Sequence, residues 1–97
     1  MPIPKKMRET LAKDPYMKTC LINKDCSGRI EWHHAFRYAG RRQNELWTLL
    51  PLCSKHHREE HKHKAVIWKA LWYRMLYFGA KDEAQTKYPL AEIFRPN

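Results

Sequence analysis

Histidine and cysteine are the residues of this chain whose types and spacing could do chemistry. The chain has six histidines and three cysteines, and residues 29–64 hold all of the histidines and one cysteine. This segment reads RIEWHHAFRYAGRRQNELWTLLPLCSKHHREEHKHK. Imidazole and thiolate groups are preferred protein ligands of Zn²⁺, and an unperturbed imidazole also exchanges a proton near neutral pH. The segment therefore predicts metal binding together with acid–base chemistry.

Three cysteines and one histidine are spaced as a structural zinc site would require. Cys53 and His56 stand three positions apart at the start of a predicted helix, where a thiolate and an imidazole can converge on one ion. Cys20 and Cys26 flank a polar turn with five residues between them, a wider spacing than that of most zinc knuckles. Together the four residues predict a closed Cys3His site that staples a thin core. The alternative is that Cys20 and Cys26 are two unconnected thiols in a turn.

A second group of histidines could form a catalytic centre. His57 and His61 are four positions apart, so they lie on one face of a continuous helix. His33 and His34 end a predicted strand and point to opposite sides, so one can bind a metal while the other stays free. A free histidine beside a Lewis-acidic metal is suited to deprotonating water. Taken singly, each of these histidines is better explained as a surface or core residue, and only the group favours catalysis. Three other polar residues of this helix are interpreted as solvated: Glu59, Glu60 and His63.

The elements that must position these side chains follow the order strand, loop, strand, helix. The predicted strands cover residues 16–22, 29–34 and 46–52, and the predicted helix covers residues 55–78. Pro51 indicates an edge position or the end of its strand, because proline cannot donate a backbone hydrogen bond. Ser54 is predicted to cap the helix, and Gly79 is predicted to end it.

The second half of the predicted helix is apolar on most of its sides and rich in aromatic residues. One stripe at helical spacing, formed by Ile67, Leu71, Met75 and Phe78, is typical of a buried core. The apolar surface beyond this stripe exceeds what a small domain buries alone. We therefore expect a cover, which could be the N-terminal segment, the tail at residues 90–94, or a partner such as a second copy in a homodimer.

The composition indicates a basic domain without a membrane segment. The chain has 19 Lys and Arg against 10 Asp and Glu, a net charge of +9. Such an excess most often indicates a nucleic-acid partner, although solubility alone is the alternative. No signal peptide or apolar run of membrane length is visible, so the predicted compartment is cytoplasmic, where thiols stay reduced.

The length of 97 residues predicts one α+β domain. We divide it into a basic N-terminal arm at residues 1–15, a metal-binding core at 16–64, and an aromatic helix with a tail at 65–97. The arm is expected to pack loosely or to lie along the partner.

Two segments of this chain resemble the HNH endonucleases, also called ββα-metal or His-Me finger nucleases. These segments are Trp32-His33-His34 and, after a loop containing Gly40, LLPLC followed by His56 and His57. The resemblance covers about residues 18–64, and the small size is similar to that of phage and prophage members. It implies a small ββα-metal finger and a metal-dependent DNA endonuclease in the cytoplasm of a bacterium or a phage-infected host.

The same resemblance implies a role for each matching residue. His34 would be the general base, His33 and His57 would bind the catalytic ion, and His61 would be a supplementary ligand. The implied ion is Mg²⁺ or Mn²⁺, with Zn²⁺ as an alternative on the same histidines. The family's asparagine, which orients the base, falls near Thr48, with Asn44 as the nearest amide, so both residues are candidates.

Basic side chains are predicted to hold the DNA backbone. The candidates are Arg37, Arg41, Arg42, Arg58, Lys5 and Lys6. Backbone contacts position a duplex without reading its bases, which favours nicking or weakly specific cutting. The alternative function is a non-catalytic zinc-ribbon module that binds nucleic acid or protein, and a third is a toxin-type nuclease controlled by a partner.

Overall fold

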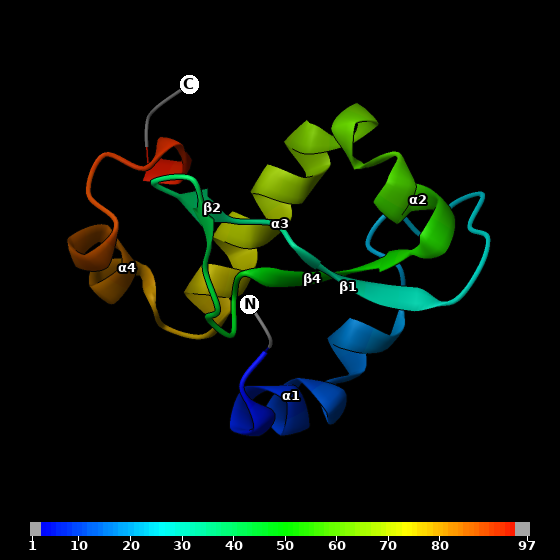
Figure 1. Cartoon of the computed structure of the whole chain (residues 1–97), viewed down its shortest axis with the longest axis horizontal. Coiled ribbons are helices and arrows are strands. Elements are labelled where there is room, and N and C mark those ends of the chain that lie inside the picture. Colours follow the sequence, from blue (N-terminus) through cyan, green and yellow to red (C-terminus); the bar gives the residue numbers. More distant parts are fainter. Residues whose placement is uncertain (1–2, 95–97) are drawn as a thin grey trace.

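Two antiparallel strands form the centre of the fold, with helices packed around them (Figure 1). The computed structural model describes residues 3–94. Strand β1 (Ile30–His34) pairs with β4 (Leu49–Cys53), so that Ile30 lies opposite Cys53 and His34 opposite Leu49. A second ribbon pairs β2 (Arg37–Tyr38) with β3 (Arg41–Arg42). The predicted α+β class is therefore confirmed.

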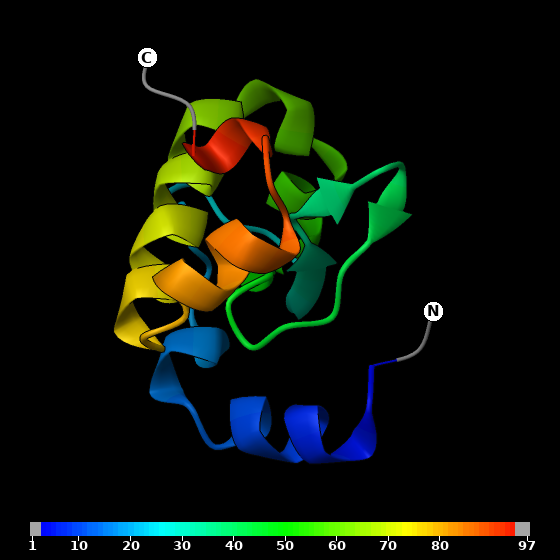
Figure 2. The ribbon, with the colours of Figure 1, turned by 90° about the vertical axis from the view of Figure 1, so that its left-hand side faces the viewer.

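The helices flank this sheet in chain order. They are α1 (Lys5–Ala12), α2 (Ser54–Arg58), α3 (Lys64–Tyr77) and α4 (Lys81–Lys87), with short 3₁₀ segments at Pro15–Lys18, Glu60–Lys62 and Glu92–Phe94. None of these helices has the length and apolar content that crossing a bilayer demands. Figure 2 shows the C-terminal segment lying between α3 and the β2–β3 ribbon.

Strand β4 is buried along its whole length and still contains a proline. All five of its residues are buried, and Leu50 and Leu52 belong to the main core. The carbonyl of Pro51 accepts a hydrogen bond from the backbone N–H of Leu21 at 2.8 Å, on the edge away from β1. Because the N and C=O of one strand residue point to the same edge, the missing N–H of Pro51 does not interrupt the β1 pairing. The predicted edge position of this proline is confirmed.

The strand predicted at residues 16–22 is wrong. Pro15 follows Asp14, whose carboxylate accepts a hydrogen bond from the backbone N–H of Tyr16 at 3.0 Å, and this cap starts a 3₁₀ turn instead. The turn buries Met17 against Leu11 and Leu49 in a second small core. The apolar residues that suggested a strand are therefore explained by tertiary packing.

The single helix predicted over residues 55–78 is also wrong. The chain leaves helical geometry after Arg58, makes a 3₁₀ turn, and restarts at Lys64 after His63, whose φ is −125°. The polar run between the two helices has no apolar stripe to hold it on the core, and backbone hydrogen bonds of 2.9 Å from Lys62 to Glu59 and from His63 to Glu60 form the 3₁₀ turn instead. Ser54 does not cap α2, because the sulfur of Cys53 accepts from the backbone N–H of His56.

The predicted end of the aromatic helix is confirmed. Gly79 has a φ of +63°, the left-handed conformation that glycine adopts without strain. Its backbone N–H donates to Leu76 at 3.0 Å, and the N–H of Ala80 donates to Met75 at 3.0 Å. These two bonds satisfy two of the last carbonyls of α3.

The apolar surface of α3 is covered partly by the tail. The rings of Trp72 and Phe94 lie 6.3 Å apart, and Ile93 also packs on the main core. Trp68, Tyr73 and Tyr77 remain 39%, 58% and 71% exposed. A partner chain on this remaining surface stays a prediction.

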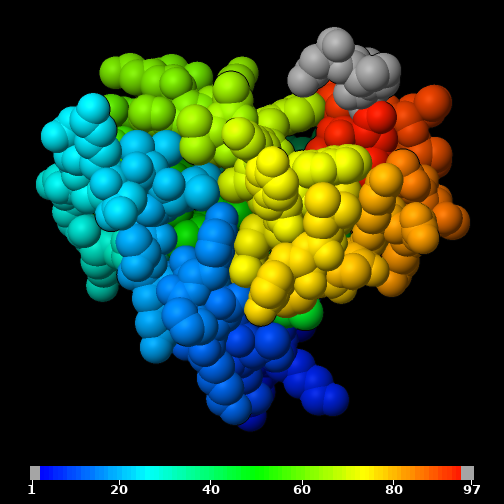
Figure 3. Space-filling view, turned by 180° about the vertical axis from the view of Figure 1, so that it is seen from behind, coloured from blue at the N-terminus to red at the C-terminus, as the bar shows by residue number. Residues whose placement is uncertain are grey.

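The N-terminal arm is packed on the body rather than loose. Leu11 is only 1% exposed, and an ion pair of 2.6 Å joins Asp14 to Arg74 of α3. The guanidinium of Arg74 also lies 4.0 Å from the ring centroid of Tyr16. Figure 3 shows the N-terminal segment and α3 side by side on the back of the molecule.

Replacing Arg74 tests this attachment. We expect Arg74→Ala to lower the free energy of unfolding by about 3 kcal/mol, because it leaves a partly buried Asp14 carboxylate unpaired. The matched control Lys69→Ala, on the exposed side of the same helix, should change it by less than about 0.5 kcal/mol. Urea unfolding followed by circular dichroism measures both, and equal effects would contradict the role given to Arg74.

The ion pair of Asp14 and Arg74 makes the stability of the fold depend on pH. Burial would raise the pKa of Asp14, but the hydrogen bonds from Arg74 and Tyr16 outweigh it and hold the pKa below the ordinary value of 3.8. A lowered folded pKa stabilises the fold above the unfolded value, and this stabilisation is lost as the pH falls through the lowered pKa.

Candidate metal centres

The Cys3His cluster comes together as its spacing predicts. The ligand atoms of Cys20, Cys26, Cys53 and His56 all lie within 4.8 Å of one another. The three sulfurs stand 3.5, 3.8 and 3.2 Å, in that order, from Nδ1 of His56. Zinc bonds of about 2.3 Å to sulfur and 2.1 Å to nitrogen place these atoms about 3.6 Å apart in a tetrahedron. This cluster could therefore hold a metal ion such as zinc.

A tight loop brings Cys26 to the other three ligands despite its wide spacing. Asn23, Asp25 and Gly28 all have positive φ, which folds residues 23–28 back on themselves. The backbone N–H of Lys55 then donates to the carbonyl of Ser27 at 3.1 Å, which fixes the loop to the start of α2. A Cβ on Gly28 would lie 2.7 Å from the side chain of Ser54, so only glycine fits there.

The thiol pKa values show why this cluster suits a cation. Burial would raise the pKa of Cys53, but hydrogen bonds from the backbone at His56 and Ser27 and from the neighbouring thiols lower it to about 7. Burial and the same neighbours, Cys20 and Cys53, raise the pKa of Cys26 to about 11. One thiolate is therefore available near neutral pH, whereas repulsion between neighbouring thiolates disfavours a second. A divalent cation at the cluster would offset this repulsion.

A second cluster joins β1 to the segment after α2. Ligand atoms of His33, His57 and Glu60 lie within 4.8 Å of one another, and all three side chains are partly buried. Nδ1 of His33 is 2.9 Å from the Glu60 carboxylate, and the two imidazole rings are centred 5.1 Å apart. The structure thus brings together His33 and His57, as predicted, in a group that could hold a metal ion.

Glu60, which was interpreted as solvated, occupies the place predicted for His61. The break after Arg58 ends the helical spacing of four between His57 and His61, and it turns Glu60 toward His33. His61 is exposed and is not one of the clustered residues among those described. Sequence periodicity could not identify Glu60, because the periodicity argument assumes a continuous helix and the helix ends at Arg58.

Glu31 is a further residue of this centre that the sequence analysis did not single out. Its carboxylate lies 2.7 Å from Nδ1 of His57 and accepts a hydrogen bond from Ser54 Oγ at 2.9 Å. These contacts, His57 first, lower the pKa of Glu31, so it is charged at neutral pH. A carboxylate on one ring nitrogen orients histidine and leaves the other nitrogen for a metal. Strand alternation puts Glu31 and His33 on one face, a signal that could have found it.

His34 lies on the other face of β1 and contacts Asn44. Its Nε2 is 3.1 Å from Asn44 Oδ1, so the amide oxygen accepts from this nitrogen and Nδ1 carries the lone pair. Burial, followed by the charge of Arg42, lowers the pKa of His34 despite the bond to Asn44. The ring is therefore neutral at neutral pH and able to take a proton.

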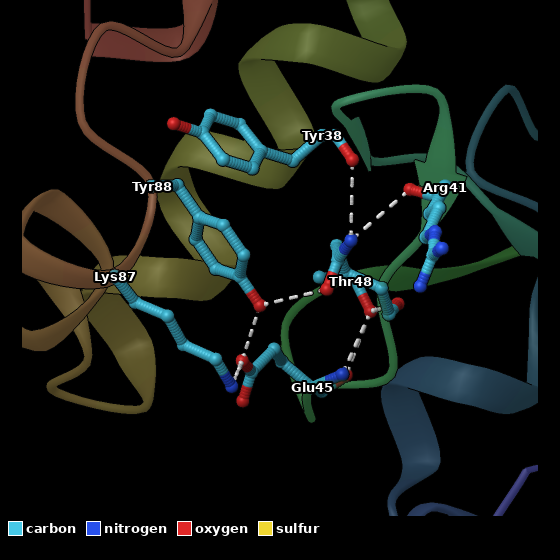
Figure 4. A network of polar contacts seen from close by, with 7 residues as sticks. Tyr38, Arg41, Glu45, Thr48, Lys87 and Tyr88 are labelled. Atoms are coloured by element: carbon cyan, nitrogen blue, oxygen red, sulfur yellow. Dashed lines mark hydrogen bonds and ion pairs between the residues drawn. The ribbon is translucent and has the colours of Figure 1, made fainter.

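Thr48, the other candidate for orienting His34, has a structural role. Its buried hydroxyl contacts the carbonyl of Gln43 at 2.7 Å and accepts from the backbone N–H of Glu45 at 3.0 Å. Glu45 in turn binds Lys87 and Tyr88, which ties this loop to α4 (Figure 4). Of the two candidates, the structure places Asn44 at His34 and Thr48 within the loop.

His33 and His57 of the second cluster open on one groove together with some of the predicted DNA-binding residues. The groove has a volume of about 1960 Å³, and its walls include His33, His34, Arg37, Arg42 and Arg58. The other three candidates are exposed but do not line it: Arg41, Lys5 and Lys6. Helix α1, which carries the two lysines, lies at the opposite end of the molecule (Figure 1).

A scan against protein-family models found no match, and searches of curated proteins and of solved structures found none either. The functional argument for this chain therefore depends on the geometry of the two centres.

Removing one ligand tests the Cys3His centre. We expect the purified chain to hold about one zinc ion tightly, and Cys53→Ser to lose it and to unfold at a markedly lower temperature. His63→Ala is the matched control, because its ring packs 5.2 Å from His56 but is not a ligand. Elemental analysis and thermal unfolding measure the outcome. A zinc-free chain with full stability would contradict the assignment.

Glu31→Gln tests the second centre. It should weaken Mn²⁺ binding there by about 10- to 100-fold, because a neutral amide no longer holds the His57 ring in its ligand orientation. Glu59→Gln removes the same charge from a side chain that forms an ion pair with Lys62 and is outside both ligand sets among the described residues, so it serves as the control. Calorimetric titration with Mn²⁺ compares the two variants, and equal losses would show that only local charge matters.

Proposed function

We propose that this protein is a metal-dependent DNA endonuclease of the HNH type. The observation that carries the proposal is the division of the adjacent pair His33 and His34. His33 joins a three-residue cluster that could hold a metal, whereas His34 is outside that cluster, lines the same groove and contacts Asn44. A neutral histidine next to a metal centre in a basic groove has the features required for phosphodiester hydrolysis.

The two clusters differ in the way that structural and catalytic metal sites differ. The Cys3His cluster offers four protein ligands, which complete a tetrahedron and leave no position for substrate. The cluster of His33, His57 and Glu60 offers three, which leaves positions for water and a phosphate oxygen. Its carboxylate suits Mg²⁺ or Mn²⁺, and its imidazoles also suit Zn²⁺.

The residues of the chain divide the reaction between them. His34 takes a proton from the water that attacks phosphorus in line, and Asn44 holds its ring by accepting from Nε2. Arg37, Arg42 and Arg58 lie on the groove walls, where they bind backbone phosphates and position the strand. The chemistry that a divalent cation supplies at His33, His57 and Glu60 is stabilisation of the charge on phosphorus and on the departing 3′ oxygen.

The Cys3His cluster by itself supports a second candidate, a non-catalytic zinc-ribbon module that binds nucleic acid. That function requires only the zinc ligands and a basic surface. It leaves without explanation the second cluster, its Glu31 support and the contact between His34 and Asn44. We therefore rank the nuclease first.

Substitution of the two adjacent histidines separates these functions. With supercoiled plasmid and Mg²⁺ or Mn²⁺, His34→Ala should lower the cleavage rate by about 10²- to 10⁴-fold without weakening Mn²⁺ binding. His33→Ala should weaken Mn²⁺ binding, and excess Mn²⁺ should restore part of the rate. Gel analysis of nicked and linear plasmid measures the rate.

His63→Ala, outside both ligand sets among the described residues, is the control and should cleave normally. If excess Mn²⁺ rescues His34→Ala rather than His33→Ala, the two roles are exchanged. If the unmodified protein binds plasmid but never cuts it, the zinc-ribbon alternative holds.

A further inference from the structure

The groove at the second metal centre continues well beyond its ligands. It runs from His33 and His57 along α3 to the β2–β3 ribbon and the C-terminal segment. Figures 1 and 2 show these three elements around the same region, and a hydrogen bond of 2.8 Å from Tyr38 to Pro89 joins two of them. The hydrolytic chemistry described above uses only one end of this groove.

Aromatic and basic side chains alternate along the wall that α3 contributes. Lys64, Trp68 and Trp72 follow one another at intervals of four residues, and Lys69 and Tyr73 form a second row beside them. All five residues line the groove. Trp68 and Tyr73 are 39% and 58% exposed, so their ring surfaces are available to a ligand.

The charge of the groove favours an anionic occupant. Its lining includes five residues with a basic side chain other than histidine, against two glutamates. The basic residues are Arg37, Arg42, Arg58, Lys64 and Lys69. One of the two glutamates, Glu60, is already in contact with His33 at 2.9 Å. A polyanion that also carries flat apolar groups complements such a surface.

We propose that this groove binds an unpaired DNA strand, with one base stacked on Trp68 and the backbone held by Lys64, Lys69 and the arginines. In a duplex each base face is covered by the neighbouring base pair, so the exposed aromatic rings of the groove gain no stacking energy from a duplex. In a single strand each base offers a face to an aromatic ring, and stacking tolerates any sequence. The inference rests on the proposed function for the identity of the strand as DNA, and it makes the preferred substrate a duplex with an unpaired arm.

Fluorescence anisotropy with three labelled probes tests the proposal. The probes are a 16-nucleotide DNA strand that cannot pair with itself, the blunt duplex of the same sequence, and the matching RNA strand. Titrations use the full-length His34→Ala chain, so that the DNA is not cut. The DNA strand should bind more tightly than the duplex and the RNA. Adding Trp68→Ala should weaken strand binding by about 5- to 150-fold, the range for loss of one stacked base, and change duplex binding little.

Two further variants guard against a folding artefact. Trp68→Phe keeps an aromatic ring and should retain most of the affinity, and Tyr73→Ala should weaken strand binding independently. Tyr77→Ala is the matched control, because Tyr77 is an exposed aromatic residue of the same helix that does not line the groove. The thermal unfolding temperature should be similar for Trp68→Ala, Trp68→Phe, Tyr73→Ala and Tyr77→Ala.

The outcomes separate this inference from the nuclease proposal. Strand binding that depends on Trp68, in a protein that never cuts plasmid, supports the groove assignment and refutes the nuclease. Plasmid cleavage by a protein whose strand affinity is the same in Trp68→Ala and Tyr77→Ala refutes the groove assignment alone. Tighter binding of the duplex or of the RNA strand than of the DNA strand also overturns it.

Discussion

The antiparallel pairing of β1 with β4 is the constraint on which both candidate metal centres depend. Its register places Ile30 opposite Cys53, so the strand that carries His33 and His34 runs beside the strand that ends in a zinc-ligand candidate. Helix α2 starts directly after Cys53 and inherits this position. A slip of one residue would turn His33 and Glu31 to the opposite face and exchange the environments of His33 and His34.

Backbone geometry places the two members of each adjacent histidine pair in different environments. In β1, successive side chains point to opposite sides, which separates His33 from His34. In α2, successive side chains are about 100° apart, which directs His56 to the cysteines and His57 to His33 and Glu31. Each pair therefore serves two environments without any additional element, which suits a chain of 97 residues.

The sequence predicts those parts of the site that depend on local spacing. The Cys3His ligands were predicted from their spacing, the pairing of His33 with His57 from the HNH resemblance, and the edge position of Pro51 from its missing N–H, and the structure keeps all three. The parts that it misses depend on tertiary contacts. Glu60 replaces His61 because the chain breaks after Arg58, a break that no proline or glycine in residues 58–64 marks.

Glu31, the other site residue that the sequence analysis did not single out, shows a different limit of sequence-based prediction. Glu31 was visible as a strand neighbour of His33, but its importance comes from the 2.7 Å contact with His57, a residue 26 positions away. Helix caps are equally ambiguous in sequence. Ser54 fits the statistics of a cap, yet Cys53 performs this function, while Ser54 holds Glu31.

Helix α2 connects the two candidate centres, because it carries His56 of one and His57 of the other. This helix has five residues, which is far below the length at which an isolated helix is stable in water. Its first turn is held instead by Cys53, whose sulfur accepts from the N–H of His56, and by the loop at Ser27, whose carbonyl accepts from the N–H of Lys55. A cation held by the Cys3His cluster would tie these attachments together, because its ligands come from the loop, the strand and the helix. We therefore expect the orientation of His57 toward His33 and Glu31 to depend on an occupied Cys3His cluster, although none of the four Cys3His residues belongs to the proposed catalytic group.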